Sequence, residues 1–379
     1  MLNSIVYSLT IEISNPNLRP FKLYVDDKKV KNIELVNLLV RYLKFMPNMV
    51  FVDGIDEADY GLSFEKKVET VNIFLTFLKT QEVVTFEVKK NEDNINTAIK
   101  LADLIFEKIT QTNGIFSTNL VFSMNWNGVR QIFLSDISGK KIRKLTDNLT
   151  DSVAPKISPQ RNLVVYTRYF KTGGTSLRLI DLKNLDDIPI YSSKGLNVAG
   201  SFSEDGTKIY FTSYDGKISK IFIYDINKKS LESVYSSRSR LASPVKTYKN
   251  NSIAFVSDEY GSPQIFLFSL ENKKIKRLTY KHNYSTSPSF APTGTHFLYV
   301  AMVSGINKIY ASSIDGADFA LLTPIEKSFE DPHWSRNERF IFALSKESNS
   351  SSVYLIDIST LRYTKLFTLP AIMSYLYIE

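Results

Sequence analysis

The feature that most constrains this chain is an internal repeat of about 44 residues. An aromatic residue recurs inside a short apolar run at intervals of 43 to 45 residues. Its six copies are Phe122, Tyr166, Phe211, Phe255, Tyr299 and Phe342. Self-similarity at a fixed period is the signature of a repeat architecture, in which each unit packs on its neighbours.

Two further columns keep the same register. About fourteen residues after each aromatic, a second apolar run ends in a short polar residue. These polar residues are Asp136, Asp181, Asp225, Ser269, Ser313 and Asp357. About eleven residues before the later aromatics stand Pro155, Gly200, Pro244, Pro288 and Pro332. We expect the aspartates to end the third strand of each unit and to accept hydrogen bonds from the following turn.

Each unit holds about four short runs rich in Val, Ile, Tyr and Phe, separated by turn sequences such as Asp215-Gly216 and Asp315-Gly316. Units of ~40 to 45 residues with four strands are typical of propeller blades. The high aromatic content, 21 Tyr and 25 Phe, also favours strands. The sequence therefore predicts a mainly β fold whose main part, residues 114–379, is a six-bladed β-propeller.

The first unit, which begins near Asn119, lacks its innermost strand, because only five copies of the Pro/Gly column precede residue 340. Near the end of the sequence, Pro370 is followed by an apolar run. We expect residues 371–377 to pair with residues 120–125 and close the ring. Closure removes two free edges at which an open sheet would aggregate.

Residues 1–113 show a different pattern and are predicted to form a small α/β domain. Apolar residues at helical spacing predict one helix through Val36 and Leu43 and a longer one from an Asn94 cap to Ile109. The expected strands are residues 21–25, 49–53, 71–78 and 83–90. The junction with the propeller is placed at residues 112–114, directly after the second helix.

Composition and charge exclude several classes of function. The chain has no cysteine, which excludes disulfides, thiolate metal sites and cysteine nucleophiles. Residues 1–113 hold 14 basic and 16 acidic side chains, whereas the remainder hold 33 and 23. Because these lysines are scattered singly through predicted turns, solvated turns explain the basicity better than a nucleic-acid surface.

The first twenty residues lack a basic start and carry Glu12 and Asn15 where a signal peptide would be apolar. Either the protein is cytoplasmic, or a leader has been removed and Met1 added. No window of 18 apolar residues is present, so no membrane span is predicted.

The inventory of catalytic groups is thin. The three histidines are His282, His296 and His333, and no G-x-S-x-G, P-loop or G-x-G-x-x-G motif occurs.

His333 is expected to face the propeller channel in the column of Lys156, Ser201, Val245 and Ser289. A metal held by His282 and His333 with Glu330 or Asp331 is a minor alternative to a channel-lining polar residue. Paired carboxylates such as Asp186-Asp187 and Asp258-Glu259 are expected in solvated turns. We predict no catalytic residue, metal or cofactor.

Three stretches resemble the TolB family, the propeller components of the Tol-Pal cell-envelope system of Gram-negative bacteria. The segment ADLIFEKITQTNGIFSTNLVFS (102–123) resembles the family's helix and crossover, and LTIEIS (9–14) followed by Arg19-Pro20 resembles its opening. Blade motifs such as GSFSEDGTKIYFTS (200–213) and PSFAPTGTHFLYVA (288–301) resemble its PxFSPDG pattern. The resemblance covers essentially the whole chain.

The resemblance implies a non-enzymatic, monomeric periplasmic scaffold with its leader removed. It also implies binding of the lipoprotein Pal at the propeller, contact with TolA through the N-terminal region, and support of outer-membrane integrity during division. The alternative is a propeller enzyme or small-ligand or metal binder that uses the central channel. The TolA segment would include Leu9, Ile11 and Ile13, for which an ordinary edge strand is the other reading.

The expected Pal site is the channel mouth, where residues just before the Pro/Gly column converge. Its residues are Ser152, Val153, Ala154, Leu196, Asn197, Val198, Ala199, Leu241, Ala242, Ser243, Tyr284, Ser285, Thr286, Ser287, Phe329, Glu330 and Asp331. The register carries the contact role most directly to Leu196, Asn197, Ala199 and Ala242, and we expect both alanines to be exposed. Small residues mixed with Leu and aromatics suit an interface with an apolar centre.

Overall fold

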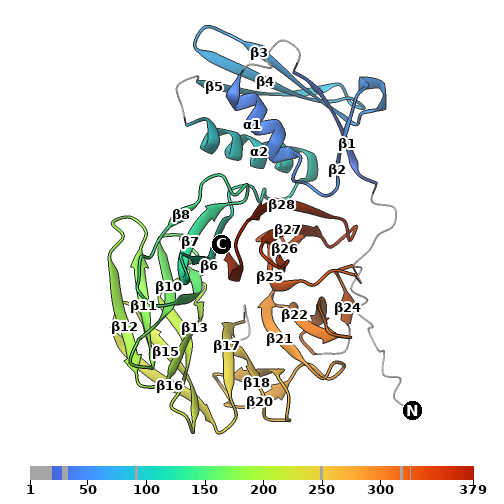
Figure 1. Ribbon diagram of the computed structural model, residues 1–379. Coiled ribbons are helices and arrows are strands. Elements are labelled where there is room, and N and C mark those ends of the chain that lie inside the picture. Colours follow the sequence, from blue (N-terminus) through green and yellow to red (C-terminus); the bar gives the residue numbers. More distant parts are fainter. Residues whose placement is uncertain (1–18, 28–32, 90–92, 248–250, 316–318, 325) are drawn as a thin grey trace, which may run out of the picture.

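A computed structural model of the chain describes residues 19–27, 33–89, 93–247, 251–315, 319–324 and 326–379. An N-terminal α/β part lies against one side of a ring of strands (Figure 1). Helix α2 ends at Thr110 and the first propeller strand, β6, begins at Asn119, so the proposed division at residue 113 falls between them. None of the helices in the described residues is both long and apolar enough to cross a membrane.

The N-terminal part is a five-stranded sheet in the order β2-β1-β3-β4-β5, with two helices. The elements are β1 (Phe21–Asp26), α1 (Glu34–Leu43), β2 (Met49–Val52), η1 (Ile55–Glu57), β3 (Tyr60–Lys66), β4 (Thr70–Phe77), β5 (Glu82–Lys89) and α2 (Asn94–Thr110). Strand β1 runs parallel to both β2 and β3, and the remaining pairs are antiparallel. Both predicted helices and all four predicted strands are present, and β3 is an addition.

The predicted helix cap is wrong by one residue. The carboxylate of Asp93 caps α2, because its Oδ1 accepts hydrogen bonds from the backbone N–H groups of Ile95 and Asn96 at 3.0 and 3.1 Å. The Asn94 amide instead donates to Glu34 on α1 at 2.8 Å. The two helices are therefore tied together at the point where α2 begins.

The propeller consists of six four-stranded antiparallel sheets. From the innermost strand outward, the first blade is β29 (Met373–Ile378), β6 (Asn119–Trp126), β7 (Val129–Asp136) and β8 (Arg143–Lys144). The second is β9 (Ser152–Ile157), β10 (Leu163–Tyr169), β11 (Thr175–Asp181) and β12 (Asp187–Ser193). The third is β13 (Leu196–Phe202), β14 (Lys208–Tyr214), β15 (Ser219–Asp225) and β16 (Ser230–Ser237).

The last three blades follow the same order. The fourth is β17 (Leu241–Lys246), β18 (Ser252–Ser257), β19 (Gln264–Ser269) and β20 (Ile275–Arg277). The fifth is β21 (Ser285–Phe290), β22 (His296–Val303), β23 (Ile306–Ser313) and β24 (Phe319–Leu321). The sixth is β25 (Glu330–Trp334), β26 (Phe340–Lys346), β27 (Ser351–Asp357) and β28 (Tyr363–Leu369). The mainly β, six-bladed fold that the repeat predicts is therefore the fold of the protein.

The C-terminal strand occupies the innermost place in the first blade. Strand β29 pairs antiparallel with β6, with Met373 opposite Met124 and Ile378 opposite Leu120. Met373 and Leu376 are fully buried. The two ends of the propeller sequence thus meet in one sheet, as the missing inner strand predicts.

The repeated aromatics form the centre of each blade. All six lie on the second strand and are at most 3% exposed. In four blades the ring stacks on the aromatic directly opposite on the third strand, as Phe211 does on Phe222 at 5.3 Å between centroids. Such cross-strand pairs stabilise a sheet beyond their buried area.

The aspartate column ends the third strands and binds the turns that follow. The Oδ1 atoms of Asp181, Asp225 and Asp357 accept backbone N–H groups two or three residues on, at 2.8 to 2.9 Å. The expected turn role is therefore confirmed. One paired carboxylate differs, because Asp187 begins β12, accepts from the Tyr166 hydroxyl at 2.7 Å and pairs with Arg178 at 2.9 Å. The expectation of a solvated turn is wrong for Asp187.

The N-terminal part packs on the propeller face that carries the loops joining first to second and third to fourth strands. We call this the docked face. Phe106 of α2 contacts Phe340 at the start of β26, with centroids 5.8 Å apart. The Tyr42 hydroxyl of α1 donates to Asp136 at 2.8 Å. The opposite face, which carries the loops between blades and between second and third strands, is called the free face.

Candidate functional site: the propeller channel and its free face

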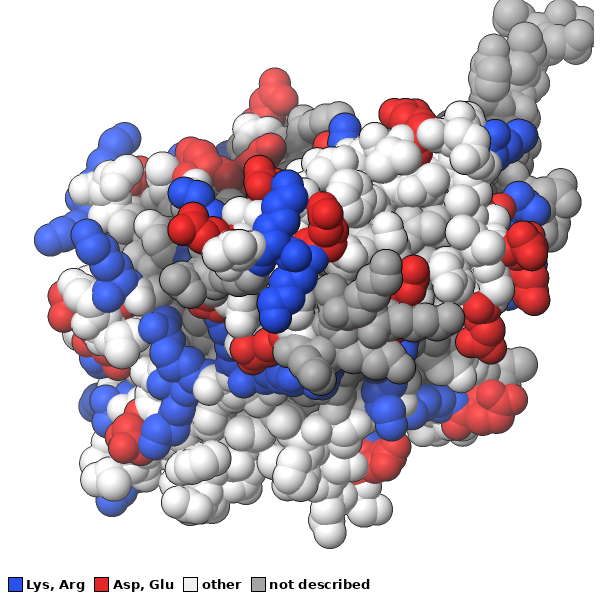
Figure 2. All heavy atoms as spheres, turned by 90° about the horizontal axis from the view of Figure 1, so that it is seen from above, with Lys and Arg blue, Asp and Glu red and all other residues white. Residues whose placement is uncertain are grey.

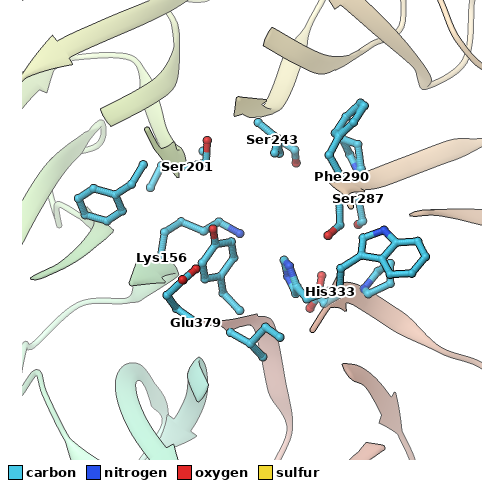
Figure 3. A pocket seen from close by; sticks show the side chains of 18 of the residues that line it. Lys156, Ser201, Ser243, Ser287, Phe290, His333 and Glu379 are labelled. Carbon is cyan, nitrogen blue, oxygen red and sulfur yellow. The ribbon is translucent and has the colours of Figure 1, made fainter. Parts of the chain in front are cut away.

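The six innermost strands surround a cavity of about 200 Å³ on the propeller axis (Figure 3). Two rings of side chains line it, one from each blade per ring. The bulge ring consists of Ala154, Ala199, Ser243, Ser287, Asp331 and Tyr375. The channel ring, two residues further along each strand, consists of Lys156, Ser201, Val245, Ser289, His333 and Tyr377. The prediction that His333 shares a channel-facing column with Lys156 is confirmed.

The backbone at the bulge ring is strained in a repeated way. Every innermost strand has an irregular register at this level. Five ring members have φ between 47° and 55°, and four of these precede a proline, where extended backbone is normal. Bulges and strain of this kind re-aim side chains and are common beside functional sites.

The third blade has a glycine in place of the proline at this level. Its column residue is Gly200, where an added Cβ would lie 2.2 Å from the carbonyl oxygen of Pro244. Strand β17 therefore approaches β13 too closely for any side chain at that position. Glycine replaces proline in the column because the neighbouring blade occupies the space.

The channel ring holds groups whose pKa values burial has shifted. Burial lowers the pKa of the Lys156 ammonium to about 8. Burial, with the nearby Lys156 charge, lowers the pKa of His333 to about 3, so this imidazole is neutral near pH 7. Its Nε2 lies 2.9 Å from the Leu376 carbonyl oxygen, and its ring packs edge-on against Tyr377 at 4.7 Å between centroids. His333 is thus a polar member of the channel wall.

The two other histidines lie elsewhere. His282 packs against Tyr310, with centroids 4.3 Å apart, and is absent from the residues that line the cavity. His296 begins β22 and its Nδ1 lies 2.9 Å from the Thr295 hydroxyl. The described residues contain no group of three or more His, Cys, Asp and Glu side chains arranged to hold a metal ion. The hypothesis that His282 and His333 share one metal site is therefore wrong.

The predicted mouth residues divide into three groups by exposure. Two are exposed on the free face, Leu196 at 40% and Ala242. The partly buried members are Val198, Ser243, Tyr284, Thr286, Ser287, Glu330 and Asp331. The buried members are Ser152, Val153, Ala154, Asn197, Ala199, Leu241, Ser285 and Phe329. The contacts of this set with a partner stay a prediction.

Two of the residues most directly expected to contact Pal, Asn197 and Ala199, are buried in the propeller. Ala199 is 3% exposed, so the expectation that it is exposed is wrong, because it packs in the core between the second and third blades. The Asn197 amide donates to the Thr175 carbonyl oxygen at 2.8 Å and its Oδ1 accepts from Ser193 at 3.0 Å. Fully buried, Asn197 holds the loop before β13 in place.

Sequence reasoning missed a set of exposed apolar side chains around the mouth. They stand in the loops between blades, at the turns joining second to third strands, and on β29, so they share the free face. This apolar crown consists of Trp126, Leu149, Phe170, Ile218, Tyr260, Tyr280, Met302, Ile372 and Tyr375, each at least 36% exposed. Its signal in the sequence is register alone, because five of its members stand at or beside equivalent turns between second and third strands, 42 to 48 residues apart.

The residues expected to contact TolA, Leu9, Ile11 and Ile13, lie outside the described residues. At the first described residue, the exposed Arg19 guanidinium pairs with the Asp59 carboxylate, with 2.8 Å between Nη2 and Oδ1. The side of the molecule that carries the N-terminal part shows interspersed acidic and basic side chains (Figure 2). A surface of this kind gives no single-sign field for a polyanion to follow.

Comparisons with known proteins place these features in a family. Residues 106–371 match the TolB beta propeller domain family. The Tol-Pal system protein TolB of Bordetella pertussis is 28% identical over 62% of this chain and 64% of its own length. A protein TolB homolog of Chlorobium luteolum is 27% identical over 45% of this chain and 38% of its own length. The matched regions thus span less than two thirds of these curated relatives.

A solved structure shows the same overall fold. TolB from Acinetobacter baumannii superposes with a TM-score of 0.83, covering 95% of this chain and 96% of its own, at 18% identity. The putative TolB from Agrobacterium tumefaciens gives a TM-score of 0.54 over 67% of this chain at 15% identity. The family match covers most of the chain. It includes every propeller strand except β29, which closes the ring. The chain belongs to the TolB β-propeller family.

Proposed function

We propose that this protein is a non-enzymatic scaffold of a Tol-Pal system, located in the periplasm, that binds Pal on the free face and TolA through residues 1–14. In this role it links envelope components and supports outer-membrane integrity during division. Relatives named as Tol-Pal system proteins support the system, and the structure of the free face supports the binding mode. The proposed division into residues 1–113 and 114–379 assigns one partner to each part.

The observation that carries the proposal is the distribution of exposed apolar side chains on the propeller. The apolar crown surrounds a mouth lined by small residues, and the N-terminal part covers part of the opposite face. Exposed aromatic and aliphatic anchors around a recessed centre are typical of protein interfaces.

The strain in the bulge ring fits the same role. Five αL residues, Ala154, Ser243, Ser287, Asp331 and Tyr375, hold their side chains in fixed directions at the mouth, so this surface is organised before a partner binds. A preorganised surface loses little conformational entropy on binding and so binds more tightly. The net positive charge of residues 114–379 would in addition speed the capture of an acidic partner.

The experiment is a binding titration of the full chain with the Pal protein of the same organism. Leu196→Glu and Ala242→Glu place a charge at exposed positions of the free face, and each should weaken Pal binding roughly tenfold or more. Leu361→Glu is the matched control, because Leu361 is 39% exposed in a turn of the docked face. Equal affinities for all three folded variants would place the Pal site elsewhere.

The TolA contact is tested by a separate deletion. Removal of residues 1–14 should abolish TolA binding and leave Pal binding and the melting temperature unchanged. A variant that loses its fold instead would assign these residues to the α/β part as an ordinary edge strand, and would contradict this half of the proposal.

A further inference from the structure

Among the described residues, the ammonium group of Lys156 in the channel forms no hydrogen bond and no ion pair, although the carboxyl group of Asp331 lies near enough to interact with its charge. Lys156 extends from β9 into the cavity (Figure 3). The equivalent positions in the other blades hold Ser201, Val245, Ser289, His333 and Tyr377, so the repeat does not require a cation here. Lys156 is partly buried, and its long side chain ends inside the channel.

The described surroundings of Nζ offer it an aromatic ring as its nearest contact. Nζ lies 4.6 Å from the centroid of the Tyr377 ring, a cation–π contact that gives it a π face and no oxygen acceptor. Among the described residues, Lys156 forms no side-chain hydrogen bond and no ion pair. An ammonium carries three donors, and leaving them without partners inside a protein is unfavourable.

Three acidic side chains line the cavity, and none of them makes a salt bridge with Lys156 in the part of the chain that the structure describes. Glu379 pairs with Arg336. Asp331 accepts a hydrogen bond from the Leu376 backbone N–H at 3.2 Å. Burial raises the pKa of its carboxyl group, and the nearby Lys156 charge opposes that rise. Glu204 is exposed, beyond the channel ring in the first-to-second loop of its blade. None of them makes an ion pair with Lys156 in the described structure.

We propose that Lys156 is the receptor for one carboxylate group bound inside the propeller channel. A cavity of about 200 Å³ is large enough for a small carboxylate, since a liquid water takes about 30 Å³. The hydroxyl of Ser289 in the channel ring can add a hydrogen bond to its oxygens. Four of the six bulge-ring residues are Ala or Ser, so a side chain entering from the free face meets little obstruction.

The carboxylate can come from either of two sources. One is a free small organic acid, and the other is an Asp or Glu side chain of a protein docked on the free face. The second source rests on the proposed function, whereas the first is independent of it. In both cases the ammonium donates to carboxylate oxygens, and no bond is formed or broken.

Trp334 lines the same cavity and makes a direct test possible. The chain has two tryptophans, so Trp126→Phe leaves Trp334 as the single tryptophan, which can be excited selectively at wavelengths that tyrosine does not absorb. Titration of this variant with sodium acetate at constant ionic strength should give a saturable change with a midpoint on the order of millimolar. Acetamide, a neutral molecule of similar shape, should give no saturable change.

Lys156→Met should abolish the acetate response, and Lys156→Arg, which keeps the charge, should retain it. Lys220→Met, at an exposed lysine of β15, is the matched control. The second arm measures Pal affinity of the full chain that retains Trp126. A tenfold loss with Lys156→Met and none with Lys220→Met identifies a partner's acidic side chain, whereas an acetate response with unchanged Pal affinity identifies a free acid.

The inference is overturned if, in folded variants, replacement of Lys156 by Met changes neither the acetate response nor Pal affinity. A response of equal size to acetate and acetamide, with unchanged Pal affinity, overturns it as well. Failure of the proposed function is a different result, because it is the absence of Pal binding by the unmodified chain. Melting curves of the Met and Arg variants separate loss of binding from loss of fold.

Discussion

The third-strand ends and the channel ring share one 44-residue period, yet they behave in opposite ways. The strand ends hold Asp in four blades and Ser in two, and their side chains bind the turns beside them. The channel ring holds Lys, Ser, Val, His and Tyr at equivalent positions. A residue that repeats with the blades stabilises the blade, whereas a residue that differs between blades shapes the one site that all six blades share.

The two faces of the propeller also differ, in how far their apolar side chains are covered. The docked face is partly covered by α1 and α2, through Tyr42, Phe106 and the Phe116 segment that follows them. That segment is fixed by Asp103, which accepts the Phe116 backbone N–H at 2.7 Å and leaves no room for a side chain at residue 114. The free face instead exposes the apolar crown. The apolar groups under α1 and α2 are therefore buried, whereas those of the crown stay exposed.

The largest expected effect follows from breaking the repeat itself. Deletion of residues 370–379 removes β29, the inner strand of the first blade, together with three buried apolar side chains. Each buried apolar side chain is worth ~1.5–3 kcal/mol and each ladder hydrogen bond ~1 kcal/mol, so the loss should exceed about 5 kcal/mol. We expect a large fall in melting temperature by calorimetry and aggregation through the free edge of β6. A truncated protein that melts like the parent would contradict ring closure by β29.

A second change tests whether members of the aspartate column are equivalent. Asp136 is buried and accepts hydrogen bonds from Tyr42, Ser138 and two backbone N–H groups, whereas Asp225 accepts one from the Lys228 backbone. Asp136→Ala should therefore cost about 3–4 kcal/mol of the free energy of unfolding, and Asp225→Ala about 1 kcal/mol. Urea denaturation of both variants measures the difference. Equal losses would show that contact with the N-terminal part adds nothing.

A third pair of substitutions locates the border between the blade core and the exposed rim of the free face. Ala199 is buried against the second blade, so Ala199→Glu should destabilise the protein by about 3 kcal/mol. Ala242→Glu lies on the exposed rim and should change the free energy of unfolding by less than about 0.5 kcal/mol. Thermal melting distinguishes them. A stable Ala199→Glu protein would mean that the rim extends deeper into the mouth.

Most of the fold could be predicted because its determinants repeat. The aromatic and aspartate columns each occur six times, and the missing first copy of the Pro/Gly column pointed directly to β29. Strand β3 was missed because Gly61 and Ser63 dilute its apolar alternation. Its place between β1 and β4 is decided by pairing with distant residues, which no local pattern records.

The site could be predicted only in part, because exposure depends on how neighbouring blades meet. Ala199 and Ala242 stand at adjacent registers of neighbouring inner strands, yet the first is buried and the second is exposed. Ala199 packs against side chains of the second blade, whereas Ala242 lies on the exposed rim. The crown was missed for a related reason. Its members differ in type, from Trp126 to Met302, and only the assembled ring brings their turns to one face.

The smallest expected effect concerns His333 of the channel ring. This residue should make the free energy of unfolding depend on pH, which the repeated columns do not. The pKa of His333 is about 3 in the folded protein, against 6.5 for an ordinary histidine. The folded state therefore binds the proton less readily, so the stability from this group is complete above pH 6.5 and is lost as pH falls toward 3. At 1.36 kcal/mol per unit of pH, the loss between pH 6.5 and 4.5 is about 2–3 kcal/mol.

His333→Gln keeps a donor for the Leu376 carbonyl oxygen and removes the titration. The difference in free energy of unfolding between the two proteins, measured in urea across this range, should shrink toward acid pH by that amount. Parallel curves would show that protonated His333 is accommodated in the channel.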